Sequence, residues 1–302
     1  MTVSAGSLAN LYNPQFSKIY QDAVERVEPV FDKVFNVLTS KQQYEKMGAM
    51  TGTGLLMQKT EGMDAKELQV YNKVSKTFTH NTYAGFVRIT KEAADDDLSG
   101  ELKKLPELLG IAARQTVETQ GASIFDLSQT TAGPDGVPLL SLLHPLYGGG
   151  TTAVAANRPA TNAALSVTSM ENALTGMRQT ADDYNNPKPL FPSRLLIPGS
   201  NEFMSVQLLD NLEKSGTTNR DINAIRKRGV ATIIWDYMTG LTGSWYLLCD
   251  PAETELVYYW REKINGQMKA APDTTDDAIF MSRFRNSMGW IDWRGVYGSY
   301  GS

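Results

Sequence analysis

The side chains best suited to acid–base chemistry in this chain are its two histidines, His80 and His144. They lie far apart in the sequence, and neither stands at a known catalytic spacing from a nucleophile. The motifs G-x-S-x-G, H-E-x-x-H, G-x-G-x-x-G and G-K-[ST] are absent. A catalytic triad is a spatial arrangement and not a sequential one. A hydrolase with an unrecognised site, in which His80 or His144 lines a deep pocket, therefore stays open as one alternative.

Adjacent carboxylates occur at three places, which are Asp95–Asp97, Asp182–Asp183 and Asp276–Asp277. Oxygen ligands of this kind can recruit a divalent cation. Carboxylates beside a helix entrance are also stabilised by the helix dipole and by water. The two later pairs stand in polar, turn-rich segments, which do not supply the opposed environments of a general acid and a general base. We therefore expect no catalytic residue, no metal site and no cofactor.

A run of glycines at Gly148–Gly150 precedes Thr151 and Thr152, a composition also found in loops that cradle phosphate. The lysine and the strand-loop-helix spacing of a phosphate-binding loop are missing. We interpret this run as a flexible junction and place a domain boundary there.

The composition narrows the class of protein further. The chain has 302 residues and a formal net charge of −4, whereas proteins that mainly neutralise nucleic-acid phosphates carry a large excess of Lys and Arg. The single cysteine, Cys249, excludes an intrachain disulfide. No apolar run is long enough to span a bilayer, and Met1–Asn13 lacks the features of a signal peptide. These observations favour an ordered protein that contacts no membrane and binds nucleic acid at most weakly.

The element that organises the chain is a long amphipathic helix expected at about 102–128. Its apolar stripe recurs every four residues, at Leu105, Leu109, Ala113, Val117, Gly121 and Phe125. Arg114 and Glu118 are spaced to pair across one turn on the solvent side. We call this element the spine helix and expect it to support the structures around it.

The first 40 residues form an unusually apolar arm with helical periodicity. An amphipathic arm of this kind either folds back on its own domain or docks on a neighbouring subunit, and the sequence leaves both alternatives open. Residues 41–90 then change character, because glycines punctuate polar residues and the run Ser75–Thr90 is rich in strand-forming residues. We expect a long hairpin with a Met-bearing tip at Met47–Met63. A long excursion without its own core usually has a binding function.

Helices and strands are mixed through the rest of the chain. Thr168 and Glu171 predict a capping box at the start of a helix, and a second helix is expected to carry Phe203 and Val206 on its apolar stripe. From Val230 onward the chain is rich in strands. The order of elements predicts an α+β fold and does not repeat as βαβ units.

Two segments of the sequence resemble a known family. Residues 280–298, which contain Trp290 and Trp293, resemble the closing segment of tailed-bacteriophage major capsid proteins of the Mu-like head-subunit type, which have the Hong Kong 97-type capsid fold. Residues 135–146, from Asp135-Gly136-Val137 to His144-Pro145-Leu146, resemble a second segment of that family. The order of elements agrees along nearly the whole chain.

The resemblance implies a division of the chain into four parts. An N-terminal arm spans residues 1–40, and an extended loop spans residues 41–90. A peripheral domain built on the spine helix comprises residues 91–150 and 251–289, and an axial domain comprises residues 151–250 and 290–302. In this family the arm and the loop lie across neighbouring subunits, and the axial domains meet at the centres of hexamers and pentamers.

The function implied is that of the major capsid protein of a tailed double-stranded DNA phage, which assembles with itself into an icosahedral shell around the genome. It would have no enzymatic activity, would assemble in the host cytoplasm and would reside in the virion. Further partners implied are portal, scaffold and decoration proteins, with nonspecific DNA contact. The alternative within the fold is an encapsulin-like shell of a bacterial compartment. We expect a subunit interface that includes residues of the arm, the loop tip and the chain end, which are Phe16, Tyr20, Phe31, Phe35, Met50, Leu55, Met57, Trp290, Trp293 and Arg294. Deletion of residues 1–40 is expected to leave a soluble chain that no longer closes shells.

Overall fold

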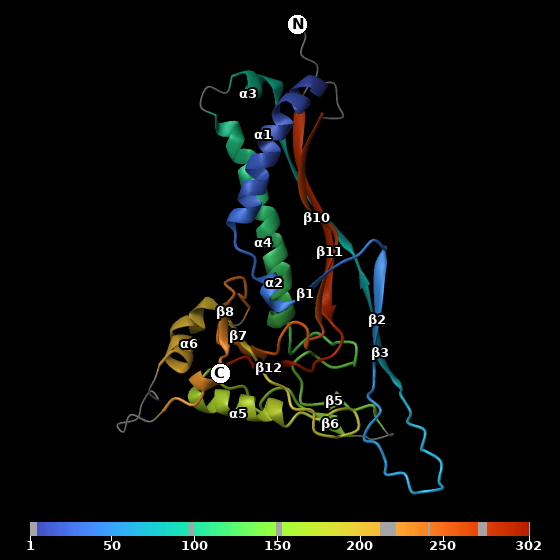
Figure 1. Ribbon diagram of the computed structural model, residues 1–302. Coiled ribbons are helices and arrows are strands. Elements are labelled where there is room, and N and C mark those ends of the chain that lie inside the picture. Colours follow the sequence, from blue (N-terminus) through green and yellow to red (C-terminus); the bar gives the residue numbers. More distant parts are fainter. Residues whose placement is uncertain are drawn as a thin grey trace.

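The computed structural model describes residues 5–96, 100–148, 153–211, 222–240, 242–270 and 277–301. Parts of three features named in the sequence analysis lie outside the described residues. They are Asp97, the run from Gly149 to Thr152, and Asp276. The described chain has an elongated part, a compact part and a hairpin that runs beside them (Figure 1).

The helices are α1 (Ala5–Arg26), α2 (Phe31–Val34), α3 (Lys91–Asp95), α4 (Lys104–Asp126), α5 (Val167–Arg178) and α6 (Glu202–Leu209), with the 3-10 turns η1 (Glu101–Lys103), η3 (Gly199–Asn201) and η4 (Arg226–Arg228). The strands are β1 (Asn36–Thr39), β2 (Tyr44–Met50), β3 (Asn72–Thr79), β4 (Asn81–Ile89), β5 (His144–Pro145), β6 (Val154–Ala155), β7 (Arg194–Ile197), β8 (Ala231–Ile234), β9 (Trp245–Leu248), β10 (Leu256–Ala270), β11 (Ala278–Trp290) and β12 (Val296–Ser299).

The elongated part is a four-stranded sheet of order β1-β10-β11-β4, with α1 and α4 lying along it (Figure 1). The short strand β1 runs parallel to β10, whereas β10, β11 and β4 are antiparallel to their neighbours. The spine helix is α4, and it lies inside the range expected from the apolar stripe. Its stripe faces the arm and the sheet, because Ala113, Val117 and Phe125 are buried there.

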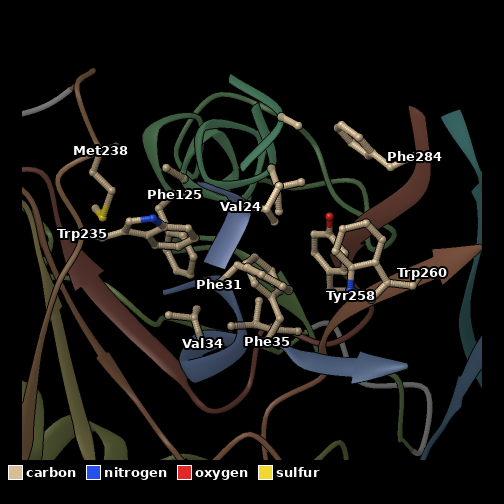
Figure 2. Packing of buried hydrophobic residues seen from close by; sticks show 14 of the residues in the cluster. Val24, Phe31, Val34, Phe35, Phe125, Trp235, Met238, Tyr258, Trp260 and Phe284 are labelled. Atoms are coloured by element: carbon tan, nitrogen blue, oxygen red, sulfur yellow. The ribbon is translucent and has the colours of Figure 1, made fainter. Parts of the chain in front are cut away.

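The arm folds back on its own chain. Helix α1 packs against α4 and β10, and the Cβ of an alanine at Gly110 would lie 2.7 Å from the backbone oxygen of Tyr20. Phe31 and Phe35 complete the core between α4 and the sheet, where they contact Tyr258 (Figure 2). The sequence left open whether the arm packs on its own domain or on a neighbouring subunit, and the structure shows it packed on its own domain. Because residues 1–40 contribute to the core, their deletion would expose apolar surface of the body, so we no longer expect the truncated chain to stay soluble, and the loss of shells stays a prediction.

The spacing of Arg114 and Glu118 predicted an ion pair on the solvent side of the spine helix. This prediction was wrong for Glu118. Its side chain is fully buried, and its two carboxylate oxygens accept hydrogen bonds from the backbone N–H groups of Val30 and Phe31, each at 3.2 Å. These donors lie at the start of α2, where helical N–H groups have no partner within the helix. Arg114 instead donates from Nε to the backbone oxygen of Val24. Both side chains of the spine helix thus hold the arm in place.

The extended hairpin is shorter than the range 41–90 suggested. Strands β2 and β3 pair with each other from Tyr44–Thr79 to Met50–Asn72. The predicted second strand is split at His80, and β4 beyond it pairs with β11 in the sheet of the elongated part. Residues 81–89 therefore belong to the body of the molecule.

The compact part is a second four-stranded sheet, of order β12-β9-β7-β8, with α5 and α6 beside it. Strand β12, near the chain end, pairs with β9, so the final segment returns to this sheet. Helix α5 begins two residues earlier than predicted, because the capping box is formed by Ser166 and Ser169. A continuous core of Leu195, Ile197 and Trp245 packs under α5.

Candidate subunit-interface surfaces

Seven of the predicted interface residues are buried within their own chain. Their exposed fractions are 5% or less, and they are Phe16, Tyr20, Phe31, Phe35, Trp290, Trp293 and Arg294. The four from the arm pack against α4, β10 and β11, where Tyr20, for example, lies against Phe280 with ring centroids 5.5 Å apart. A side chain covered by its own chain has no surface left for a neighbour. In this conformation their apolar surface stabilises the subunit itself.

The other three predicted residues lie on the hairpin loop, which we define as residues 51–71 together with Met50. Met50, Leu55 and Met57 are exposed by 70%, 72% and 64%. Leu56 and Met63 lie in the same loop and are exposed as well, so the loop carries several uncovered apolar side chains beside charged ones such as Lys59 and Glu61. The loop projects beyond the compact part in Figure 1. An exposed apolar cluster of this kind is typical of a protein–protein contact site.

The base of the hairpin is fixed on the body by a small apolar cluster. Phe78 and Ala49 of the hairpin pack with Val257 and Tyr259 of β10 and with Ile291. Beside this cluster, the ammonium group of Lys76 lies 4.5 Å from the centroid of the Trp290 ring. Burial lowers the pKa of Lys76.

Beyond its apolar base the hairpin meets the body through charged and polar side chains. The ammonium group of Lys73 lies 2.7 Å from Asp292 Oδ2 and 3.5 Å from Asp183 Oδ1. The guanidinium group of Arg294 lies 2.9 Å from Asp292 Oδ2 and 3.1 Å from Asp183 Oδ1. We call these four residues the ionic cluster. Burial acts to raise the pKa of Asp292, but Arg294 and Lys73 outweigh it and hold that pKa below its ordinary value.

A second exposed apolar surface lies on the compact part and was not predicted. The sequence placed Phe203 and Val206 on the buried stripe of a helix, but in α6 they are exposed by 80% and 45%. The buried face is formed by Ser205, Leu208 and Leu209 instead. Ile222 is also exposed, by 70%, and the neighbouring Asn223 donates a hydrogen bond to the backbone oxygen of Leu208. This face of α6 is a second candidate contact surface.

Both histidines make side-chain contacts inside the fold. His144 is fully buried, with Nδ1 2.7 Å from Asp135 Oδ2 and Nε2 3.1 Å from Asn157 Oδ1. His80 Nδ1 lies 2.9 Å from the hydroxyl of Ser287, and burial lowers the pKa of His80. The hydrolase alternative required a deep pocket lined by one of them. A cavity of about 480 Å³ between α5 and η4 is lined by neither.

The sequence also raised the questions of metal binding, of the single cysteine and of membrane-spanning segments. Within the residues that the structure describes, no group of three or more His, Cys, Asp or Glu side chains is placed to hold a metal ion. Cys249 is buried, and burial raises the pKa of its thiol to about 12. None of the described helices is both long and apolar enough to cross a membrane.

The architecture places the chain in a class of shell-forming folds. It is similar to a subunit of the mature capsid of bacteriophage PhiM1, with a TM-score of 0.61 and 9% identity over 91% of this chain and 87% of that chain. It is similar to the capsid of bacteriophage JBD30 decorated with minor capsid protein trimers, with a TM-score of 0.57 and 13% identity over 70% of this chain and 92% of that chain. It is also similar to a virus-like particle from Pyrococcus furiosus, with a TM-score of 0.55 and 10% identity over 95% of this chain and 99% of that chain. At these identities the likeness shows the fold alone.

A family model described as phage capsid protein matches residues 73–299. The chain therefore belongs to the phage capsid protein family. It is a major capsid protein of a tailed phage, and its place is the virion. A search of curated proteins found no match. The fold alone does not separate a phage head from a compartment shell, but the family model does, and the encapsulin-like alternative is not favoured.

Proposed function

We propose that the chain assembles into hexamers and pentamers that close an icosahedral shell around a double-stranded DNA genome. The observation that supports this proposal most directly is the hairpin loop. Its apolar side chains are uncovered in the single chain, and an exposed cluster of such side chains usually marks a contact site for a partner. Placing the tip on a second copy of the chain buries it, and the association then stabilises both subunits.

The parts of the fold can be matched to the domains that the family resemblance implies. The elongated part, with α1, α4 and the sheet β1-β10-β11-β4, corresponds to the arm and the peripheral domain. The compact part, with the sheet β12-β9-β7-β8, corresponds to the axial domain. The exposed face of α6 supports a contact between axial domains, because Phe203 and Val206 have no apolar cover within the described chain. Subunits of a ring meet head to tail, through two different surfaces of the same chain. The loop tip and the α6 face are two different surfaces of this kind.

The burial of seven predicted interface residues narrows the proposed interface. We retain Met50, Leu55 and Met57 of the hairpin loop as interface residues. The residues of the arm and of the chain end are assigned to the core that holds the subunit together, because they are 5% exposed or less.

The proposed partners beyond the chain itself are a portal protein, a scaffold and decoration proteins. Decoration by minor capsid protein trimers is a property of the JBD30 capsid, to which this chain is similar in fold. Contact with DNA is proposed to be nonspecific, since the formal net charge is −4. We also propose that the chain has no catalytic role.

The test is an assembly assay on a triple variant, Leu55→Ser with Leu56→Ser and Met57→Ser. Wild-type chain at micromolar concentration, alone or with a candidate scaffold, should give shells, tubes or capsomers by negative-stain electron microscopy and analytical ultracentrifugation. The serine variant should remain a small soluble species. The matched control replaces the same residues by Met, Met and Leu, which keeps an apolar tip of similar volume, and should assemble. Normal shells from the serine variant would refute the role of the tip, and a wild-type chain that stays small with scaffold would favour the hydrolase.

A further inference from the structure

The ionic cluster joins three segments that are distant in the sequence. Lys73 stands at the outer end of β3, where the hairpin loop returns to its strand. Asp183 belongs to the turn 181–187 that follows α5, and Asp292 and Arg294 follow β11. Lys73, Asp183 and Arg294 are buried and Asp292 is largely so, with side-chain exposures between 2% and 14%. The two cations and the two carboxylates balance in charge.

The body side of the cluster is held in place by several contacts. Arg294 also donates from Nε to the backbone oxygen of Ala181, and its guanidinium group stacks on Trp293 at 4.8 Å. Trp293 stacks in turn on His144, with ring centroids 4.5 Å apart and planes 14° apart. Asp182 accepts hydrogen bonds from the backbone N–H groups of Tyr184 and Asn186, which fixes the turn that presents Asp183. The lysine is the one member of the cluster that the hairpin contributes.

The outer hairpin has little other anchorage on the body among the described contacts. The hydroxyl of Tyr184 donates to the backbone oxygen of Gln69 at 2.7 Å, and the ring of Tyr184 lies against Gly54. The ring of Tyr147 lies 5.9 Å from the ammonium group of Lys73. The apolar cluster runs along the hairpin from Phe78 near its base to Ala49, which pairs with Val74 next to Lys73.

We propose that the ionic cluster is a latch that fixes the angle of the hairpin loop, with the adjoining apolar cluster of the two strands acting as its hinge. The latch and the hinge differ in the kind of side chain that each exposes to water when it opens. Charged groups that leave the latch regain hydration, which offsets much of the lost attraction. Apolar side chains that leave the hinge gain nothing from water. The hairpin loop therefore opens at the latch first and swings about the apolar cluster while the body stays folded.

The latch determines where the apolar loop tip points relative to the body. Its purpose in assembly rests on the proposed function, because the tip can meet a neighbour in one register only while the hairpin is held at one angle. The latch itself is a property of the single chain. It is therefore testable without shells.

The experiment measures a distance between the hairpin loop and the body in dilute, unassembled chain. Spin labels are placed at exposed positions on the loop and on α5, through Gln58→Cys and Asn172→Cys, and double electron–electron resonance gives the distance distribution. The native Cys249 is buried and should not take up label. The test substitution is Lys73→Met, which removes the ammonium group and keeps a side chain of similar length. Its control is Lys46→Met, which removes an exposed ammonium group from β2 of the same hairpin.

The latch predicts one narrow distance distribution in the wild-type background and in Lys46→Met. In Lys73→Met the distribution should at least double in width or split into two, while circular dichroism of the body is unchanged. An unchanged distribution in Lys73→Met, or equal broadening in both variants, would overturn the proposal. If Lys73→Met does not fold, Asp292→Asn carries the test with the same two outcomes, because it removes the carboxylate that lies closest to Lys73, at 2.7 Å, and keeps a side chain of the same shape. Shell assembly is scored separately, so failure of the latch and failure of the proposed function are distinguishable.

Discussion

Replacement of Phe35 by alanine separates the two roles that an apolar residue of the arm can have. The sequence predicted that Phe35 contacts a neighbouring subunit, whereas the structure buries it to 1% exposure inside its own chain. Its ring lies 6.1 Å from Phe125, 6.4 Å from Trp235 and 6.3 Å from Tyr258, measured between centroids. Figure 2 shows it in the same cluster as these aromatic side chains, with Trp235 to one side and Tyr258 to the other. The substitution therefore creates a cavity in the middle of the core.

The expected loss of stability is large. Phe→Ala substitutions in cores cost about 3–5 kcal/mol, because the apolar contact is lost and the cavity collapses only partly. Whole domains have unfolding free energies of roughly 5–15 kcal/mol, so Phe35→Ala should remove about a third to a half of a mid-range value. The assay is urea denaturation of unassembled chain, followed by tryptophan fluorescence, which Trp235 next to the cavity should report. The control is Leu55→Ala at a site 72% exposed, where the change should stay within about 0.5 kcal/mol.

The refuting result is specific. If Phe35→Ala unfolds at the same urea concentration as the wild type and yet fails to form shells, then Phe35 acts at the neighbouring subunit, as the sequence predicted. If it is destabilised while Leu55→Ala is not, its role is in the subunit core.

Further predictions concern the spine helix, α5 and the cysteine. Burial raises the pKa of Glu118 above 4.5, so folding favours its protonated form; stability should fall as pH rises through that raised pKa, and pH-dependent denaturation of Glu118→Gln should lack this fall. Gly110→Ala should destabilise by about 1–3 kcal/mol, because its Cβ would lie 2.7 Å from the backbone oxygen of Tyr20. Gly176→Ala should stabilise by about 1 kcal/mol in the same urea assay, because its Cβ meets only the Tyr297 ring, at 3.5 Å. Cys249 should react with a thiol reagent only on unfolding, since burial raises its pKa to about 12.

The spine helix was predictable because its apolar residues recur over many turns. A stripe that long has one physical interpretation, and α4 lies within two residues of each predicted end. The α+β class followed from the order of helical and strand-like segments, as the two sheets confirm. The alternation of Phe280, Ser282 and Phe284 on β11 with exposed or half-buried neighbours likewise marks a strand with one buried face.

The partners of the apolar surfaces were less predictable. A stripe indicates that a surface is covered, but it carries no information on which surface covers it. The stripe of α1 meets its own α4, where Gly110 lets the two backbones approach closely. The stripe expected at Phe203 and Val206 meets nothing described, and Asn223 instead binds the backbone oxygen of Leu208 at the end of α6. Both assignments depend on contacts between residues far apart in the chain.

The ionic cluster shows a further limit of reasoning from local sequence. Asp182 and Asp183 stand in a polar turn, and neighbours of that kind are expected in solvent. The structure separates them, because Asp182 binds the backbone of its own turn while Asp183 is buried against Lys73 and Arg294. Such burial needs two cations brought from positions more than a hundred residues away in either direction, so no window of sequence contains it. The same feature supports a role in holding the hairpin, since a charge cluster assembled from three distant segments exists only while all three are in place.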